Sequence, residues 1–176
     1  CNNELVIFTA ATKEILKLIH QCMIRLSELE QNSEMKNLKD QTLPVIAKLL
    51  EANQENAFLL NQWGKLLFMV DDANAAIDAF NRAIKINPNY AEPYSNLGTL
   101  LWQFGKKRDA AYFFTESLIR MPENDAFMQN FLESVYDLQE HDGMIRVLNY
   151  LKDKIQVLPA NLSKHLALAY YKVGQL

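Results

Sequence analysis

The glycines and prolines of this chain recur at a fixed interval. Gly64 and Gly98 lie 34 positions apart, and so do Pro88 and Pro122. Other residues repeat at the same interval: Ala57 and Ala91, Leu67 and Leu101, Ala76 and Ala110, Phe80 and Phe114, and Ile84 and Leu118. A fixed period of this length predicts an array of structural repeats, in which each unit packs on its neighbours and no single central core is needed.

Each repeat has the pattern of two helices. The segments 57–70 and 91–104 carry apolar residues at helical spacing, and the segments 75–86 and 109–121 do the same. We therefore expect a pair of antiparallel helices in each of two units, residues 57–90 and 91–124. Pro88 and Pro122 follow the second helices and end them.

The repeated glycine lies inside the first helix of each unit, where glycine costs about 1 kcal/mol relative to alanine. Its recurrence at one position predicts a close approach of the partner helix, which contributes the small residues Ala76 and Ala110. We expect Phe80 and Phe114 to fill the gap to the neighbouring unit.

Composition excludes several other classes of protein. Gly and Pro together make up 10 of 176 residues, which is too few turn formers for a many-stranded β-sandwich or barrel. With 49% hydrophobic and 22% charged residues the chain is too apolar to be disordered. A net charge of -3 gives no electrostatic reason to expect nucleic-acid binding. No apolar run approaches the roughly 18 residues of a transmembrane helix.

The repeated residues resemble the tetratricopeptide repeat, whose pattern is W-x2-L-G-x2-Y, then A-x3-F, then P. One unit matches with Leu60, Trp63, Gly64, Leu67, Ala76, Phe80 and Pro88, and the next with Tyr94, Leu97, Gly98, Leu101, Ala110, Phe114 and Pro122. The resemblance implies an all-α fold, a right-handed α-solenoid of antiparallel helix pairs.

The flanking segments continue the array less regularly. Residues 125–159 are expected to form a degenerate repeat, because Leu132 replaces the repeated glycine and Pro159 comes one residue late. Residues 160–176 match the first helix of a further, truncated repeat, so we expect the natural protein to continue past Leu176. Residues 41–56 are predicted to hold the second helix of a degenerate repeat, and residues 1–40 an N-terminal helical cap or a divergent repeat.

No enzyme motif is present: the sequence lacks a nucleophile elbow, a phosphate-binding glycine loop and a zinc-binding H-E-x-x-H. The chain is therefore predicted to be non-catalytic, with no cofactor and no metal. Cys22 is expected to be a buried small hydrophobe. We expect a cytoplasmic protein whose first residue lies inside a longer chain. A lipid anchor is expected only if Cys1 is a processed lipoprotein terminus.

A concave surface lined by the first helices is the expected binding site, since stacked helix pairs curve. Four columns of the repeat alignment supply its side chains: Gln62, Asn96, Asn130 and His165; Asn61, Ser95, Gln129 and Lys164; Lys65, Thr99, Glu133 and Leu168; and Phe68, Trp102, Tyr136 and Tyr171. The first three members of each column are the predicted contacts.

The chemistry of these columns favours an extended peptide. Side-chain amides both donate and accept hydrogen bonds, so a ladder of them binds a peptide backbone without reading its sequence. Aromatic rings add contact area at low entropic cost. The resemblance implies the same use for an Asn at the place of Asn96 and Asn130, although the family also carries Asn and aromatic residues there where no ligand is known. Maintenance of the fold is therefore the alternative for each residue.

Some members of the family grip a chaperone's C-terminal carboxylate with basic residues. This chain has Gln129 and Glu133 in those columns, so we do not predict chaperone-tail binding. The predicted function is a protein-interaction module that binds a protein or peptide of unknown identity. The alternative is a docking segment of a larger enzyme, such as a glycosyltransferase or methyltransferase. Self-association through the ends of the array is a further possibility.

Overall fold

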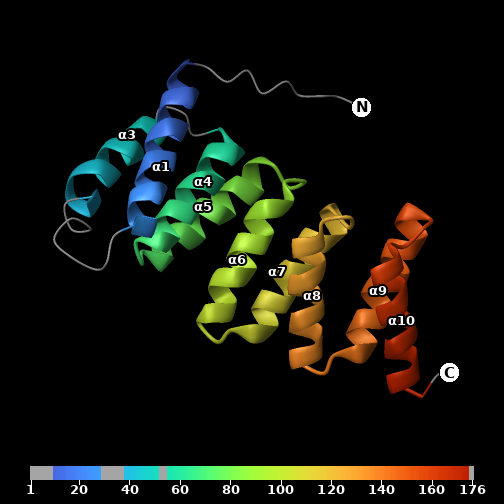
Figure 1. Cartoon of the computed structure of the whole chain (residues 1–176). Coiled ribbons are helices and arrows are strands. Elements are labelled where there is room, and N and C mark those ends of the chain that lie inside the picture. Colours follow the sequence, from blue (N-terminus) through green and yellow to red (C-terminus); the bar gives the residue numbers. More distant parts are fainter. Residues whose placement is uncertain (1–9, 29–37, 52–54, 175–176) are drawn as a thin grey trace. The chain divides into compact units, whose positions relative to one another are not determined.

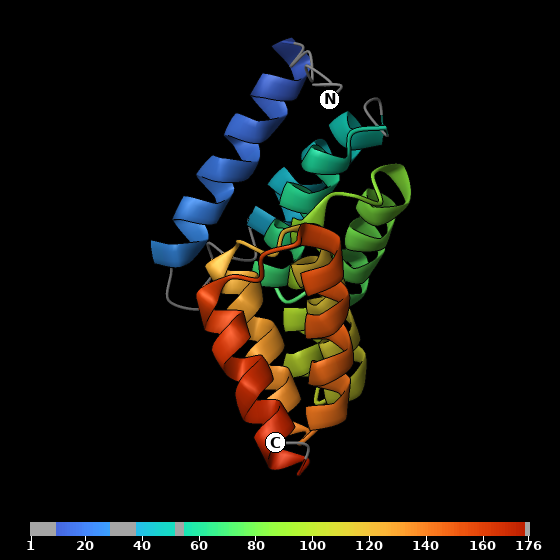
Figure 2. The same cartoon turned by 90° about the vertical axis from the view of Figure 1, so that its right-hand side faces the viewer.

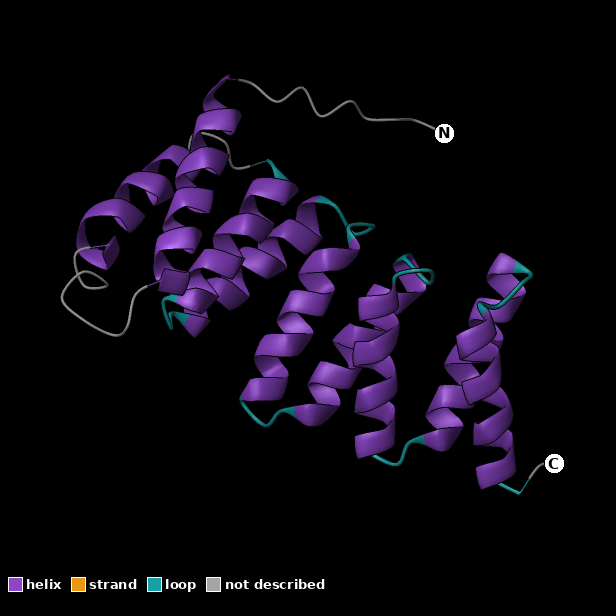
Figure 3. Ribbon diagram, viewed as in Figure 1, coloured by secondary structure: helices purple, strands orange, loops and turns teal. Residues whose placement is uncertain are grey.

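The structure is a computed structural model that describes residues 10–28, 38–51 and 55–174. Within these ranges every regular element is a helix and no strand occurs (Figure 3). The predicted all-α fold is confirmed. Cys1, the candidate lipidation site, lies outside the described residues. The chain divides into two compact units, Cys1–Pro88 and Asn89–Leu176.

The first unit combines two N-terminal helices with one regular repeat pair. Its elements are α1 (Ala10–Glu28), the π-helical turn η1 (Leu38–Thr42), α3 (Leu43–Glu51), α4 (Ala57–Met69) and α5 (Ala73–Ile86). Helix α1 contacts both α3 and α4. Their shared core contains Ile15, Ile19, Cys22, Ile46, Leu50, Leu59, Leu66 and Val70. Cys22 is buried, as predicted, and burial raises the pKa of its thiol.

The second unit is a run of five antiparallel helices. They are α6 (Ala91–Gln103), α7 (Lys107–Arg120), α8 (Asp125–Asp137), α9 (His141–Ile155) and α10 (Ala160–Lys172). Successive turns lie at opposite ends of the run (Figure 1). In the turned view α8 and α10 lie on one side and α9 on the other (Figure 2). Helices α8 and α10 therefore lie in one layer of this unit and α9 in the other.

Local sequence signals explain where several of these helices begin and end. The side chains of Asn56, Asp72 and Asn124 each accept a hydrogen bond from the backbone N–H three residues on, which satisfies a free donor of the first turn. Four first helices end in a residue with positive φ at equivalent places: Asp71 (64°), Gly105 (72°), Gln139 (57°) and Gly174 (72°). Glycine adopts this conformation without strain, whereas Asp71 and Gln139 do not.

The repeated glycine permits a close approach of the partner helix, and the nearest atoms of that helix belong to its phenylalanine. A Cβ on Gly64 would lie 2.6 Å from the ring of Phe80, and one on Gly98 would lie 2.7 Å from the ring of Phe114. Each ring therefore packs on the glycine of its own helix pair. The expectation that these rings serve mainly to fill the gap to the neighbouring unit missed this contact.

The third helix pair is more open than the second. Helices α8 and α9 approach each other less closely than α6 and α7. Leu132 stands at the place of Gly98, and Met144 at the place of Ala110, and both are buried. The distance between packed helices depends on the side chains at their contact, so two bulky residues in place of two small ones hold this pair apart.

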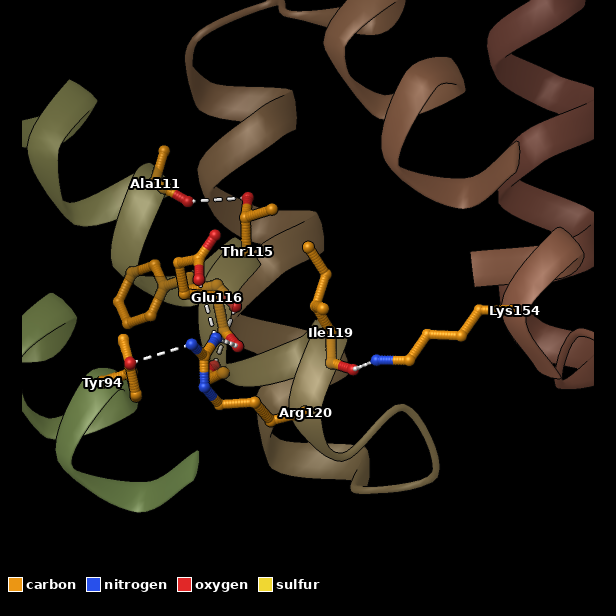
Figure 4. Close-up of polar contacts among 9 residues, drawn as sticks. Tyr94, Ala111, Thr115, Glu116, Ile119, Arg120 and Lys154 are labelled. Atoms are coloured by element: carbon orange, nitrogen blue, oxygen red, sulfur yellow. Dashed lines mark hydrogen bonds and ion pairs between the residues drawn. The ribbon is translucent and has the colours of Figure 1, made fainter. Parts of the chain in front are cut away.

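Polar side chains connect the helices of the second unit (Figure 4). Arg120 on α7 donates a hydrogen bond of 2.8 Å to the Tyr94 hydroxyl on α6, and its guanidinium carbon lies 3.8 Å from the centroid of the Tyr94 ring. The same guanidinium donates to the Glu116 carboxylate over 2.7 Å. On α9, Lys154 donates over 3.3 Å to the backbone carbonyl of Ile119. These contacts fix α6 and α9 to α7 and so hold the frame that carries the first helices.

Candidate functional site

The structure brings four of the predicted residues to one hollow between α6 and α8. Its volume is about 220 Å³. It is lined by Thr99, Trp102, Gln103, Phe114, Asn130, Glu133 and Ser134. Thr99 and Trp102 come from the first helix of one repeat, and Asn130 and Glu133 from the first helix of the next. The alignment columns therefore meet in space across adjacent first helices.

Hydrogen bonds with Ser95 fix the polar wall of the hollow. The Asn130 side chain donates from Nδ2 to the Ser95 hydroxyl over 3.1 Å, which joins α8 to α6. The Thr99 hydroxyl donates to the Ser95 backbone carbonyl over 3.0 Å. Ser95 itself is buried, with 7% of its surface exposed, and does not line the hollow. It therefore positions Asn130 and Thr99 and does not reach a partner itself.

The aromatic wall of the hollow is Trp102 with Phe114. Their ring centroids are 6.2 Å apart and the rings are inclined at 50°. The amine nitrogen of Lys107 lies 5.1 Å from the Trp102 ring centroid, within the range of a cation–π contact. The same nitrogen forms an ion pair of 2.8 Å with Asp137 at the end of α8. Trp102 is half-buried, so part of the indole is open to solvent.

Gln129 and Glu133 lie one helical turn apart on α8. Gln129 donates a hydrogen bond of 2.9 Å to Glu133 Oε1, and both side chains are exposed. Glu133 makes no ion pair with any residue in the described part of the chain. The hollow therefore has one negative charge at its edge that no cation of the described chain neutralises.

Tyr136 pairs with His165 at the next position along the array. The Tyr136 hydroxyl and His165 Nδ1 are 2.7 Å apart, which joins α8 to α10. Burial lowers the pKa of His165 below its ordinary value of 6.5, and the charge of Lys164 lowers it further. The imidazole is therefore mostly neutral at pH 7, and its tautomer decides which of the two groups donates the hydrogen bond. Burial also raises the pKa of Tyr136, which keeps its hydroxyl protonated.

The remaining predicted residues lie away from this hollow. Asn96 is half-buried on α6 and does not line it. Asn61 is 1% exposed on α4, and the buried side-chain polar atoms of the described residues all have hydrogen-bond partners, so this amide serves the fold. Gln62, Lys65 and Phe68 are half-buried on the same helix. Gln62 lines a separate hollow of about 260 Å³ between α1 and α4.

Sequence reasoning missed three lining residues: Gln103, Phe114 and Ser134. Gln103 follows Thr99 by one helical turn, so extending the helical spacing finds it. Phe114 was assigned to packing alone, and its contact with Trp102 gives it a second role. Ser134 is buried, and its hydroxyl donates to the Phe131 carbonyl over 2.7 Å, so its pattern is that of a core residue.

The described residues offer no site for metal chemistry. They contain no group of three or more His, Cys, Asp or Glu side chains placed to hold a metal ion. No helix within them is both long and apolar enough to cross a membrane. The geometry is that of a surface for contacts, with hydrogen-bonding groups and aromatic rings on adjacent helices.

A family model described as TPR repeat matches residues 64–105, which include both repeated glycines and the α6 side of the hollow. The chain carries tetratricopeptide repeats. Helix α6, on one side of the hollow, lies within the matched residues, and α8, on the other side, follows them. The recognition made from the 34-residue spacing is confirmed.

Solved tetratricopeptide repeat domains share the fold. The first such domain of Spaghetti (RPAP3), bound to the HSP90 peptide SRMEEVD, is 17% identical with a TM-score of 0.56; the match covers 76% of this chain and 98% of that one. The Sgt2 domain from Aspergillus fumigatus is 14% identical with a TM-score of 0.57, over 73% of this chain and 82% of that one. MamA is 22% identical with a TM-score of 0.51, and the match covers 97% of this chain and 98% of that one. No curated protein matches the sequence at a significant level. At these identities the likeness shows the fold.

Proposed function

We propose that this chain is a non-catalytic interaction module whose tetratricopeptide repeats bind an extended segment of a partner protein across α6 and α8. The observation that carries the proposal is the hollow between these helices, where an amide, a hydroxyl and an indole from two repeats meet. Repeats of this family are generally interaction modules and not catalysts. The comparisons do not favour the alternative of a docking segment in a larger enzyme.

The hollow supplies the two kinds of contact that a peptide needs. Asn130 donates one hydrogen bond to Ser95, which fixes the side chain and leaves its oxygen as an acceptor for a peptide N–H. Trp102 and Phe114 offer apolar surface for a side chain that follows along the peptide. Because Ser95 and Phe114 hold these groups before a ligand arrives, little ordering entropy is lost on binding.

The peptide in the RPAP3 structure ends in the acidic residues of SRMEEVD. The hollow of this chain carries a charge of the same sign as that peptide, the uncompensated carboxylate of Glu133. A chaperone tail is therefore not the expected ligand, although the relative shows that a repeat domain of this fold accepts a peptide. Self-association through the ends of the array stays a prediction.

A peptide selection tests the function. The chain is used to select binders from a displayed library of random dodecapeptides, and their affinities are measured by fluorescence anisotropy. We expect Asn130→Ala to weaken binding of the selected peptides by up to about tenfold, as the loss of one hydrogen bond does, while helicity and melting temperature change little.

Ser95→Ala is the matched control for Asn130→Ala. Both changes remove the Asn130–Ser95 hydrogen bond, but only Asn130→Ala also removes the amide that faces the hollow. Weaker binding in Asn130→Ala than in Ser95→Ala supports direct contact. Equal losses in both variants, or unfolding of Asn130→Ala, show that Asn130 is structural. Failure of the library to yield any binder contradicts the proposed function.

A further inference from the structure

The hollow between α6 and α8 carries a single charge. Glu133 is the one ionisable side chain among its seven lining residues. The neighbouring pair Lys107 and Asp137 neutralise each other over 2.8 Å, whereas Glu133 receives a hydrogen bond from Gln129 at Oε1 and makes no ion pair within the described residues. A negative potential therefore remains at the edge of the hollow.

Several of its hydrogen-bonding groups have an oxygen that can accept from a cation. The Thr99 hydroxyl spends its hydrogen on the Ser95 carbonyl, so its oxygen presents lone pairs to a ligand. Asn130 donates one Nδ2 hydrogen to Ser95, which leaves its carbonyl oxygen free to accept and its second Nδ2 hydrogen free to donate. Together with Glu133 Oε2, three oxygens on two helices are available to a donor with several N–H groups.

The indole adds a second attraction for a cation. A tryptophan ring attracts positive charge through its electron-rich face, and the Lys107 amine already lies 5.1 Å from the ring centroid of Trp102. The remaining open part of the ring borders the hollow. The volume of about 220 Å³ is below the 300–1,000 Å³ typical of sites for whole small ligands, so it suits one side chain of a longer ligand.

We propose that the hollow between α6 and α8 binds a basic side chain, Arg or Lys, of an extended peptide. This proposal rests on the proposed function and specifies the class of partner: a protein segment with a positive residue at the position that enters the hollow. The guanidinium or ammonium group meets Glu133, the Thr99 and Asn130 oxygens and the indole of Trp102 together.

The test uses three short probes that differ only in the central residue: the N-acetylated, C-amidated tripeptides Gly-Arg-Gly, Gly-citrulline-Gly and Gly-Glu-Gly. Citrulline has the shape of arginine without its charge. The chain has two tryptophans, so each indole N–H gives its own resonance in a ¹H–¹⁵N spectrum. Trp102 reports on the hollow, and Trp63, in the other unit, serves as the internal control.

We expect the arginine probe to shift the Trp102 indole in a saturable way at low salt and to leave Trp63 unchanged. The citrulline and glutamate probes should bind at least about threefold more weakly. Glu133→Gln should weaken the binding of the arginine probe by about two- to fivefold, the range for one accessible ion pair. Glu140→Gln, which removes the same charge outside this hollow, should leave that affinity unchanged.

The outcomes separate the two proposals. Equal binding of the arginine and citrulline probes, or an unchanged affinity in Glu133→Gln, overturns the preference for a basic residue while peptide binding stands. The basic preference also fails if no probe shifts Trp102 although library-selected peptides bind the chain. If the library yields no binder and no probe shifts Trp102, the proposed function fails as well.

Discussion

Gly98→Ala tests the packing that forms one wall of the hollow. The new methyl group would lie 2.7 Å from two ring atoms of Phe114 and 3.3 Å from the backbone carbonyl oxygen of Ala110. Phe114 is 5% exposed and packs beside Trp102, so a displaced ring would disturb that contact. Overpacking of this kind costs about 1–3 kcal/mol, and we place Gly98→Ala in the upper half of that range because backbone as well as a side chain obstructs the methyl.

The gain in helix propensity offsets part of that cost. Replacing a helical glycine by alanine contributes about 1 kcal/mol, so the expected net loss is about 1–2 kcal/mol of unfolding free energy. For a chain of this size that corresponds to about 2–8 °C in melting temperature. The measurement is urea and thermal unfolding followed by circular dichroism at 222 nm.

Gly143→Ala is the matched control within the same unit. A Cβ at Gly143 would meet its nearest neighbour, the Glu140 Cβ, at 3.6 Å, which is an ordinary contact. Without a clash only the propensity gain of about 0.5–1 kcal/mol remains, so this variant should be slightly more stable than the parent. The packing argument is refuted if Gly98→Ala is stabilised to the same extent as Gly143→Ala.

Three further expectations follow from the second unit. Gln139→Gly should raise the unfolding free energy by up to about 1 kcal/mol in urea titrations, because it relieves the left-handed φ of 57° at the place that Gly105 occupies in the preceding repeat; an unchanged or lower midpoint speaks against strain there. Tyr94→Phe should cost about 1 kcal/mol by removing the 2.8 Å hydrogen bond from Arg120 while retaining the ring, and a cost near zero by thermal unfolding would show that this bond adds nothing. Burial lowers the pKa of His165 in the folded chain, so the unfolded chain takes up a proton at a higher pH than the folded chain does. The contribution of the neutral imidazole to the stability of the folded chain is therefore present above the ordinary pKa of 6.5 and is lost as the pH falls through the pKa of the folded chain. His165→Gln should therefore reduce the drop in urea midpoint between pH 7.5 and 5.5, and an equal drop in both proteins contradicts this assignment.

The sequence predicted the helix pairs because their determinants are local. Periodic apolar residues and the helix-ending prolines lie within one 34-residue unit, and so does the glycine that permits close packing. The same register placed Thr99, Trp102, Asn130 and Glu133 in the predicted columns, and columns of adjacent first helices meet in space. That much of the candidate site was therefore accessible from spacing alone.

Other features depend on contacts that spacing does not contain. Asn61 occupies the same column as the exposed Gln129, yet it is buried, because exposure is decided by the helices packed around a position. Phe114 has the pattern of a core residue and nevertheless borders the hollow. The position of a residue within the repeat predicts which way its side chain points. Its burial also depends on the size of the neighbouring side chains.

The central claim is that a partner segment binds in the hollow between α6 and α8. The most direct measurement is a titration of ¹⁵N-labelled chain with a library-selected peptide, followed through the Asn130 side-chain amide and the Trp102 indole. The account predicts that these two resonances shift together and saturate with the affinity found by anisotropy, while the Trp63 indole stays in place. A peptide that saturates the chain with its shifts on α7 and α9, and with Asn130 and Trp102 unchanged, would contradict it.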